Sequence, residues 1–319
     1  MKLLFLTDTQ IRGNNPLNRT GSYVDDIEAK FKEAIQIGKD MLVDVYIHGG
    51  DFFDSPLVSL GIADRFIDLM EKSEKKWYVV RGNHDEIGHN PKLSGESMLD
   101  HTFRRSKMVS HLGSRCLDGG RVYLEGFDYY HGIEKDIKNN GLKPSDSSAT
   151  GKKIAVVHGL ISPERLPDYM MSVCSDDIDC GFDLVLVGHY HKEMGVYKNG
   201  ETTYVGIGSM ARMTIGIDDI HRRPNVLFID TETPRMKIIP LESARDFREA
   251  FKLEDVERER EADSKIDEFI SSLESTKVQG LNLRGVIEEI GSKSGFEPEV
   301  IKLVTDRIGE FESGQAVLK

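Results

Sequence analysis

The sequence predicts an α/β protein built on two β-sheets with helices on the outside. In the first two-thirds of the chain, short apolar runs are separated in places by stretches with helical periodicity. Strand–helix–strand order with buried strands is typical of an α/β sheet. Later runs are short or alternate between apolar and polar residues, with turns such as Lys198-Asn199-Gly200 between them, which favours antiparallel hairpins.

Five runs of four or five mostly apolar residues, each bounded by polar residues or glycine, predict buried strands. These runs are residues 3–6, 43–47, 77–80, 154–157 and 184–187. Two helices are predicted between them, because residues 25–40 and 62–70 repeat small or apolar side chains at about the 3.6-residue helical period. The predicted hairpin strands are residues 194–197, 203–207, 226–229 and 236–239.

The composition of the chain changes near residue 243. Residues 244–319 contain 18 acidic and 12 basic residues, show no strand-like run, and have helical periodicity at 256–273 and 300–308. We therefore expect two domains, an α/β domain over residues 1–243 and a small helical C-terminal appendage over 244–319. The appendage either packs on the chain itself or docks a partner. Residues 143–153 are rich in small and polar residues and predict a loop.

Composition excludes several classes of protein. No apolar run approaches the roughly 18 residues that a membrane span needs. The three cysteines are odd in number and lack metal-site spacing, which argues against zinc fingers and disulfide scaffolds and favours reduced thiols in the cytoplasm. The net charge of −12 argues against coating nucleic acid by charge alone, although a nuclease with a local basic groove stays open.

Polar residues follow each of the five predicted buried strands. They are Asp8 and Gln10, Asp51, Asn83 with His84 and Asp85, His158, and His189 with His191. Ligand sites in open α/β sheets lie at the carboxyl ends of the strands, so one crevice would receive all of these groups. Any one of them could instead be a capping aspartate or a core histidine, but their joint occurrence at five strand ends favours a common site.

The donor types indicate a metal centre. Carboxylate, amide oxygen and imidazole without thiolate suit Mn, Fe, Zn or Mg. Seven such groups exceed what one ion takes from a protein, so two ions sharing a carboxylate are expected. Two ions about 3.5–4 Å apart can clamp the attacking and leaving oxygens of a phosphoryl displacement.

The same motifs resemble the five-block signature of calcineurin-like metallophosphoesterases. The motifs are Asp8-x-Gln10, Gly50-Asp51, Gly82-Asn83-His84-Asp85, His158 and Gly188-His189-x-His191. The resemblance spans residues 1 to about 242 and implies a two-sheet α/β/β/α sandwich. The segments 50–54, 126–130 and 208–212 are further similar to the SbcD-type DNA repair exonucleases.

The resemblance implies a role for each residue. Asp8, Gln10, Asp51 and His191 would hold the first metal, and Asp51, Asn83, His158 and His189 the second, with Asp51 bridging. His84 would protonate the leaving oxygen or stabilise its charge, and Asp85 would orient His84. Arg12 and Arg212 lie near the motifs and are candidates for substrate binding, although a solvated, salt-bridging arginine is the simpler interpretation of each.

The implied function is a metal-dependent DNA nuclease, an exonuclease or endonuclease of repair or recombination, in which metal-bound hydroxide attacks the phosphodiester. Mn is the expected activating ion, with Mg, Fe or Zn as alternatives. The implied partners are DNA, a coiled-coil ABC-type ATPase of the SbcC type and a second copy in a homodimer; no membrane is expected.

Two departures from the family pattern keep other functions open. Gln10 stands where the family has histidine, which predicts a weaker first metal. Asp54 stands where some nucleases of the family place a phosphate-contacting histidine. The alternatives are a phosphomonoesterase, a small-nucleotide phosphodiesterase, or a metal-poor scaffold that recruits the ATPase.

Overall fold

The computed structural model describes residues 1–87, 95–167, 170–213, 222–233 and 235–252. The chain divides into two compact units, Met1–Ala250 and Phe251–Lys319, and almost all of the described residues belong to the first. The helices predicted at 256–273 and 300–308 lie outside the described residues. The domain boundary predicted at residue 243 stays a prediction.

The first sheet contains six strands, of which four are parallel neighbours and two form an antiparallel hairpin at one side. In spatial order the strands are β14 (Met236–Pro240), β13 (Asn225–Asp230), β1 (Lys2–Leu6), β2 (Val45–His48), β3 (Lys76–Val79) and β4 (Val109–His111). The antiparallel pairing of β13 with β1 joins the hairpin to the parallel part.

The second sheet also contains six strands, with four parallel strands at its centre and an antiparallel strand at each edge. Their order is β11 (Glu193–Asn199), β12 (Thr202–Ile207), β10 (Leu184–Gly188), β7 (Lys152–His158), β6 (Val122–Phe127) and β5 (Ser114–Leu117). A separate short parallel pair is formed by β8 (Ile161–Ser162) and β9 (Val173–Cys174).

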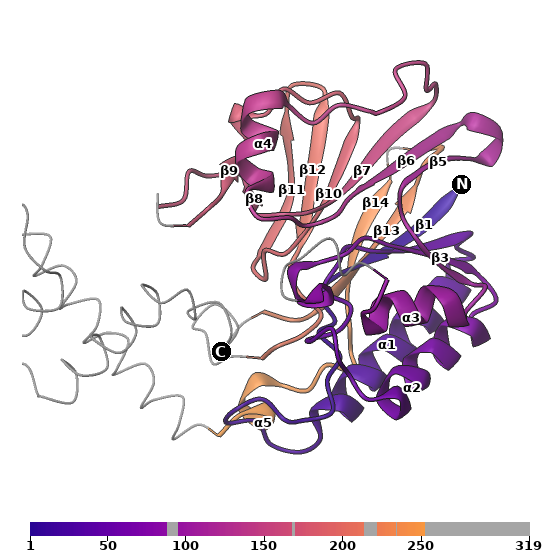
Figure 1. Ribbon diagram of the computed structural model, residues 1–319, viewed down its shortest axis with the longest axis vertical. Coiled ribbons are helices and arrows are strands. Elements are labelled where there is room, and N and C mark those ends of the chain that lie inside the picture. The colour runs from indigo at the N-terminus through magenta and orange to yellow at the C-terminus, as the bar shows by residue number, and fades with distance from the viewer. Residues whose placement is uncertain (88–94, 168–169, 214–221, 234, 253–319) are drawn as a thin grey trace, which may run out of the picture. The chain divides into compact units, whose positions relative to one another are not determined.

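Helices cover the outer face of each sheet (Figure 1). The helices α1 (Tyr23–Asp40), α2 (Leu60–Lys72) and α3 (Met98–Arg105) lie on the first sheet, and α4 (Ile133–Asn140) lies on the second. A single turn, α5 (Phe247–Ala250), follows β14. The Ser22 side chain accepts from the Asp25 N–H and caps α1, whose apolar stripe faces the sheet.

Alternation of side chains along β1 shows how the layers are held together. Leu4 and Leu6 pack with the helices, whereas Leu3 and Phe5 pack against apolar residues of the second sheet such as Leu186. Successive side chains of a strand point to opposite faces, so a strand buried on both faces must be apolar throughout. A third apolar cluster lies between the second sheet and α4. The predicted α/β/β/α arrangement is confirmed.

The two predicted hairpins belong to different sheets. Both predicted hairpins form, but β11 and β12 join the second sheet while β13 and β14 join the first. Among the described residues, the helices are too short or too polar for any of them to cross a membrane.

Candidate metal centre

The candidate ligands come from loops at the carboxyl ends of strands in both sheets. Asp8, Asp51 and Asn83 follow β1, β2 and β3 of the first sheet. His158 ends β7, and His189 and His191 follow β10, in the second sheet. The predicted site therefore draws on the carboxyl ends of strands in both sheets, and neither sheet supplies the whole cluster.

Two groups of donor atoms share one residue. Asp8, Asp51 and His191 form one group and Asp51, His158 and His189 form the other, with the donor atoms of each group within 4.8 Å of one another. Asp51 is the member common to both and is buried. This is the arrangement that a carboxylate bridging two cations requires.

Asp8 carries a carboxylate oxygen suited to a cation. Its Oδ2 accepts from the Thr7 hydroxyl (2.5 Å) and the His189 N–H (3.2 Å). Its Oδ1 is buried without a hydrogen-bond partner, 3.6 Å from Nε2 of His191. An unsatisfied buried carboxylate oxygen is costly, and a bound cation would remove that cost. The donors in this group therefore fit a divalent ion.

Gln10 lies beside His191, a member of the first group. Its side-chain nitrogen Nε2 is 3.2 Å from Nε2 of His191. The amide oxygen and nitrogen of glutamine are assigned from hydrogen bonding and can be exchanged by rotation, so the amide can present its oxygen to a cation.

His158 is oriented as histidine ligands are in metal proteins. Its Nδ1 lies 2.7 Å from the Gly49 carbonyl oxygen. Because a carbonyl only accepts, Nδ1 carries the proton and Nε2 faces Oδ1 of Asp51 (3.5 Å) and Oδ1 of Asn83 (3.3 Å). A backbone acceptor that fixes the tautomer is the usual partner of a ligating imidazole.

Four of the candidate ligands have an uncommon backbone conformation. Asp8, Gln10, Asp51 and His189 have positive φ of 51°, 42°, 50° and 73°. Such conformations are uncommon for residues other than glycine and cluster at functional sites. Hydrogen bonds from the Asp8 N–H to the Gly50 carbonyl (3.1 Å) and from the Gln10 N–H to the Asp51 carbonyl (3.0 Å) hold the two loops in this geometry.

Gly50 is required for the close approach of His158. Its φ is +101°, and a Cβ built at this position would lie 2.2 Å from Nδ1 of His158. Any other residue would therefore displace the imidazole from its place beside Asp51.

The pKa values of His158 and His189 are shifted in opposite directions. Burial opposes the charged form of His158, but the Asp51 carboxylate outweighs it and raises the pKa of His158 to about 9. Burial and the neighbouring His158 charge lower the pKa of His189 to about 4. The raised pKa favours a proton on His158, and a cation bound beside Asp51 would displace it. His189, with its lowered pKa, is already neutral and can donate to a cation without losing a proton.

His84 is held beside the cluster without belonging to either donor group. Its backbone N–H donates to Oδ1 of Asp51 (3.0 Å), and its ring Nδ1 donates to the Asp54 carbonyl oxygen (2.9 Å). Nε2 lies 4.0 Å from Oδ2 of Asp51, and the side chain is 30% exposed. The His84 side chain is therefore close to the Asp51 carboxylate and partly open to solvent.

Asp85 has a different position from the one expected. Its carboxylate accepts from the backbone N–H groups of Phe52, Phe53 and Gly82 at 3.0–3.2 Å, so it joins two motif loops rather than orienting the His84 ring. The Asp54 carbonyl takes the orienting role. Burial and the nearby Asp51 charge raise the pKa of Asp85 to about 7.

The two predicted substrate-binding arginines differ in exposure. Arg12 is partly exposed and pairs with Asp54 (2.9 Å), beside His84. Arg212 is only 5% exposed and donates to the Arg245 carbonyl. This burial does not support a substrate contact by Arg212, whose predicted role stays a prediction.

Sequence reasoning missed Tyr129 as part of this centre. Its ring lies against His189, with centroids 5.4 Å apart, and edge-on to His158 at 6.2 Å. Its backbone N–H donates to the Arg81 carbonyl (2.9 Å), which ties the end of β6 to the end of β3. The segment 126–130 gave the available signal, but nothing in it singled out one residue.

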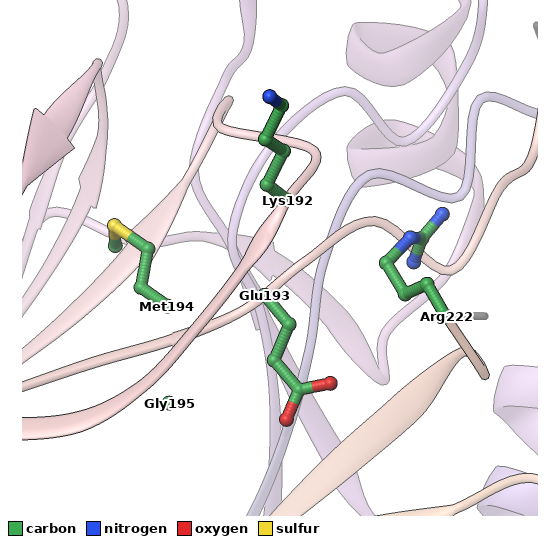
Figure 2. Close-up of a pocket in the computed structure, with 5 residues that line it drawn as sticks. All are labelled: Lys192, Glu193, Met194, Gly195 and Arg222. Atoms are coloured by element: carbon green, nitrogen blue, oxygen red, sulfur yellow. The ribbon is translucent and has the colours of Figure 1, made fainter. Parts of the chain in front are cut away.

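A pocket lies at the start of β11. It has a volume of about 510 Å³ and is lined by Lys192, Glu193, Met194, Gly195 and Arg222 (Figure 2). The Lys192 amine and the Glu193 carboxylate point in opposite directions in this view. Four of the five lining residues directly follow His191 in the chain, and none of the five is a candidate ligand.

Comparison with known proteins defines the class. Residues 1–193 match the calcineurin-like phosphoesterase family, and the chain belongs to that family. The DNA double-strand break repair protein Mre11 of Methanococcus maripaludis is 27% identical over 206 residues, which cover 60% of this chain and 52% of that protein. The protein of the same name from Methanosarcina acetivorans is 22% identical over 212 residues, 65% of this chain and 33% of that protein.

The matches thus span from a third to about half of the length of these two relatives. Among solved structures, a putative 5'-nucleotidase from Staphylococcus aureus is 14% identical, with 75% of this chain and 54% of that chain covered and a TM-score of 0.43. A similarity at that level adds nothing to the assignment.

Proposed function

We propose that the chain is a DNA nuclease of the calcineurin-like phosphoesterase family that uses two divalent ions. The observation that carries the proposal is the sharing of Asp51 by two groups of donor atoms, each within 4.8 Å. Asp8, Gln10 and His191 would complete the first ion's ligands with Asp51. Asn83, His158 and His189 would complete the second ion's ligands.

The bound ions would supply positive charge at the scissile phosphate and lower the pKa of a water molecule beside it. The buried Asp8 and Asp51 carboxylates would hold that charge in place, and the Gly49 carbonyl accepts from Nδ1 of His158, which leaves its Nε2 available as a donor to an ion. Mn is the ion that we propose for this set of oxygen and nitrogen donors, with Mg, Fe and Zn as alternatives.

His84 would act on the leaving oxygen. The Asp54 carbonyl accepts from Nδ1 of His84, so that a protonated ring can donate through Nε2 from the side facing the crevice. Proton transfer by a positioned histidine contributes about two to four decades of rate. Arg12, fixed by Asp54, lies on the same side and would contact a phosphate of the substrate.

DNA is proposed as the substrate because the relatives reported above are named for repair of DNA double-strand breaks. A role in repair or recombination, a coiled-coil ABC-type ATPase partner of the SbcC type and a homodimer belong to the same proposal. So does a cytoplasmic setting, which the three free cysteines support.

The test compares substrate classes with one protein preparation. Linear single- and double-stranded DNA, bis(p-nitrophenyl) phosphate and p-nitrophenyl phosphate are incubated with the chain in Mn, in Mg or in chelator. We expect Mn-dependent cleavage of DNA and of the diester, absent in Asp51→Asn. Hydrolysis of the monoester without DNA cleavage would favour the phosphomonoesterase. Absence of any hydrolysis, together with absence of bound metal, would favour the scaffold.

A further inference from the structure

A four-residue segment after β12 connects the two sides of the metal centre. We call Ser209, Met210, Ala211 and Arg212 the strap. Its backbone N–H groups donate in sequence to the carbonyls of His191 (3.1 Å, from Ser209), Thr7 (3.0 Å, from Met210) and Asp8 (3.0 Å, from Ala211). The strap therefore joins the loop that carries His191 in the second sheet to the loop that carries Asp8 in the first.

The carbonyl oxygens of the strap accept from buried cationic side chains. Lys30 of α1 donates to the Met210 carbonyl at 2.5 Å. Arg222 donates to the carbonyls of Ser209 and Ala211, and Arg19 donates to the carbonyl of Arg212 at 3.2 Å. Lys30 is 3% exposed and Arg222 is 9% exposed, and Arg222 also forms a wall of the pocket in Figure 2.

Burying cationic side chains is unfavourable unless hydrogen bonds within the protein replace those lost to water. Burial, and then the nearby charges of Arg212 and Arg19, lower the pKa of Lys30 well below its ordinary value. Either protonation state keeps an N–H to donate, so the contact with the Met210 carbonyl does not depend on the charge. A methionine side chain of similar length would be buried without that cost but could not donate to the Met210 carbonyl.

We infer that Lys30 is a positioning residue for the first ion's ligands, acting through the strap. The chain of contacts runs from Lys30 to Met210, from Met210 to the Thr7 carbonyl, and from the Thr7 hydroxyl to Oδ2 of Asp8. The inference rests on the metal binding proposed above. The second group is held differently, since His158 is fixed by the Gly49 carbonyl. Loss of Lys30 should therefore weaken one ion and spare the other.

The test titrates Lys30→Met with Mn by calorimetry. Changing a residue that orients metal ligands weakens metal affinity by about 10- to 100-fold. We expect a loss of this size at one of the two sites. Lys32→Met is the matched control, because Lys32 lies on the same helix, is 57% exposed and forms a surface ion pair with Glu28. The control should bind both ions as the unchanged chain does.

Two background variants identify the affected site. In His191→Ala, which removes a ligand of the first ion, adding Lys30→Met should change the remaining Mn affinity little. In His189→Ala, which removes a ligand of the second ion, adding Lys30→Met should weaken the remaining site by the full factor. The reverse pattern would overturn the inference.

A milder variant covers the case in which Lys30→Met does not fold, as judged by circular dichroism. Ser209→Ala removes the buried hydroxyl that donates to the Ala211 carbonyl (2.6 Å) and accepts from Arg222, and it should weaken the same single site. Wild-type Mn affinity at both sites in these variants would overturn the role of the strap while leaving the proposed nuclease intact. No Mn binding by the unchanged chain would overturn the proposed function itself.

Discussion

The Asp51 carboxylate accepts a hydrogen bond from the backbone N–H of His84 at 3.0 Å. Asp51, which both donor groups share, thus also holds the backbone of His84, the residue proposed to donate a proton. Metal binding and proton transfer are nevertheless separable, because only the backbone of His84 makes this contact with Asp51, and the His84 ring is turned to the Asp54 carbonyl.

His84→Gln should therefore keep both ions and lose rate. We expect cleavage of the diester to slow by about two to four decades, the contribution of a positioned proton donor. Mn stoichiometry by calorimetry and cleavage rates are measured on the same sample. His131→Gln, at an exposed histidine, is the control and should retain the wild-type rate. Loss of both ions from His84→Gln would mean that the role assigned to this side chain is wrong.

Gln10→His should tighten the first site. The Gln10 amide lies 3.2 Å from Nε2 of His191, and an imidazole in its place would offer a stronger nitrogen donor to Mn or Zn. Calorimetric titration should show one site strengthened and the other little changed. Gln36→His, at an exposed position of α1, controls for adventitious binding by an added histidine. Weaker Mn binding by Gln10→His would show that the pocket is shaped around an amide.

His48 should make the fold sensitive to acid. Burial lowers the pKa of His48 from 6.5 to about 3, and its ring accepts from the Gly50 N–H and contacts the Thr9 hydroxyl. Because the unfolded chain binds the proton more readily, the stability that the neutral ring contributes is complete above pH 6.5 and is lost as pH falls towards 3.

Urea unfolding at pH 7.5 and pH 5 measures this effect. The chain should lose about 2 kcal/mol more of its free energy of unfolding over that interval than His48→Gln does. His131→Gln should keep the wild-type pH dependence. Equal pH dependence in His48→Gln and the unchanged chain would show that His48 is not a buried neutral group.

The metal centre should survive removal of the C-terminal unit. Residues up to Ala250 make contacts that a cut at residue 243 would break: Arg245 donates to the Thr20 carbonyl (2.9 Å), and the Ala250 carbonyl accepts from the Thr20 N–H (2.9 Å). A chain ending at Lys252 keeps these contacts and every candidate ligand. It should bind Mn with wild-type stoichiometry in a calorimetric titration, and loss of binding would mean that residues beyond 252 support the centre.

The gathering of the candidate ligands was predictable because sheet topology brings strand ends together. Each ligand directly follows an apolar run, and a parallel strand delivers that position to one edge. Gln10 comes near His191 by a route that the sequence argument did not predict. Two-residue spacing on extended backbone predicts that Asp8 and Gln10 share a face, whereas both residues have positive φ and Gln10 reaches His191 from turned backbone.

Other features depend on contacts between distant residues. The strand β6 was not predicted because Glu125 and Gly126 interrupt its apolar run. Glu125 is buried with bonds from the Tyr123 hydroxyl and the Ser145 N–H, and Gly126 lies against the Leu112 carbonyl. The contact between Lys30 and the strap could not be predicted either, because residues 209–212 show no periodic pattern and lie far from Lys30 in the sequence.

The central claim is that Asp51 holds two ions at once, and counting bound Mn tests it most directly. The unchanged chain should bind two Mn ions, and Asp51→Asn should bind neither at the concentration that fills the wild-type sites, because its loss removes a ligand from both groups. Asp40→Asn, at an exposed carboxylate of α1, should bind two. Two ions bound by Asp51→Asn with wild-type affinity would contradict the account.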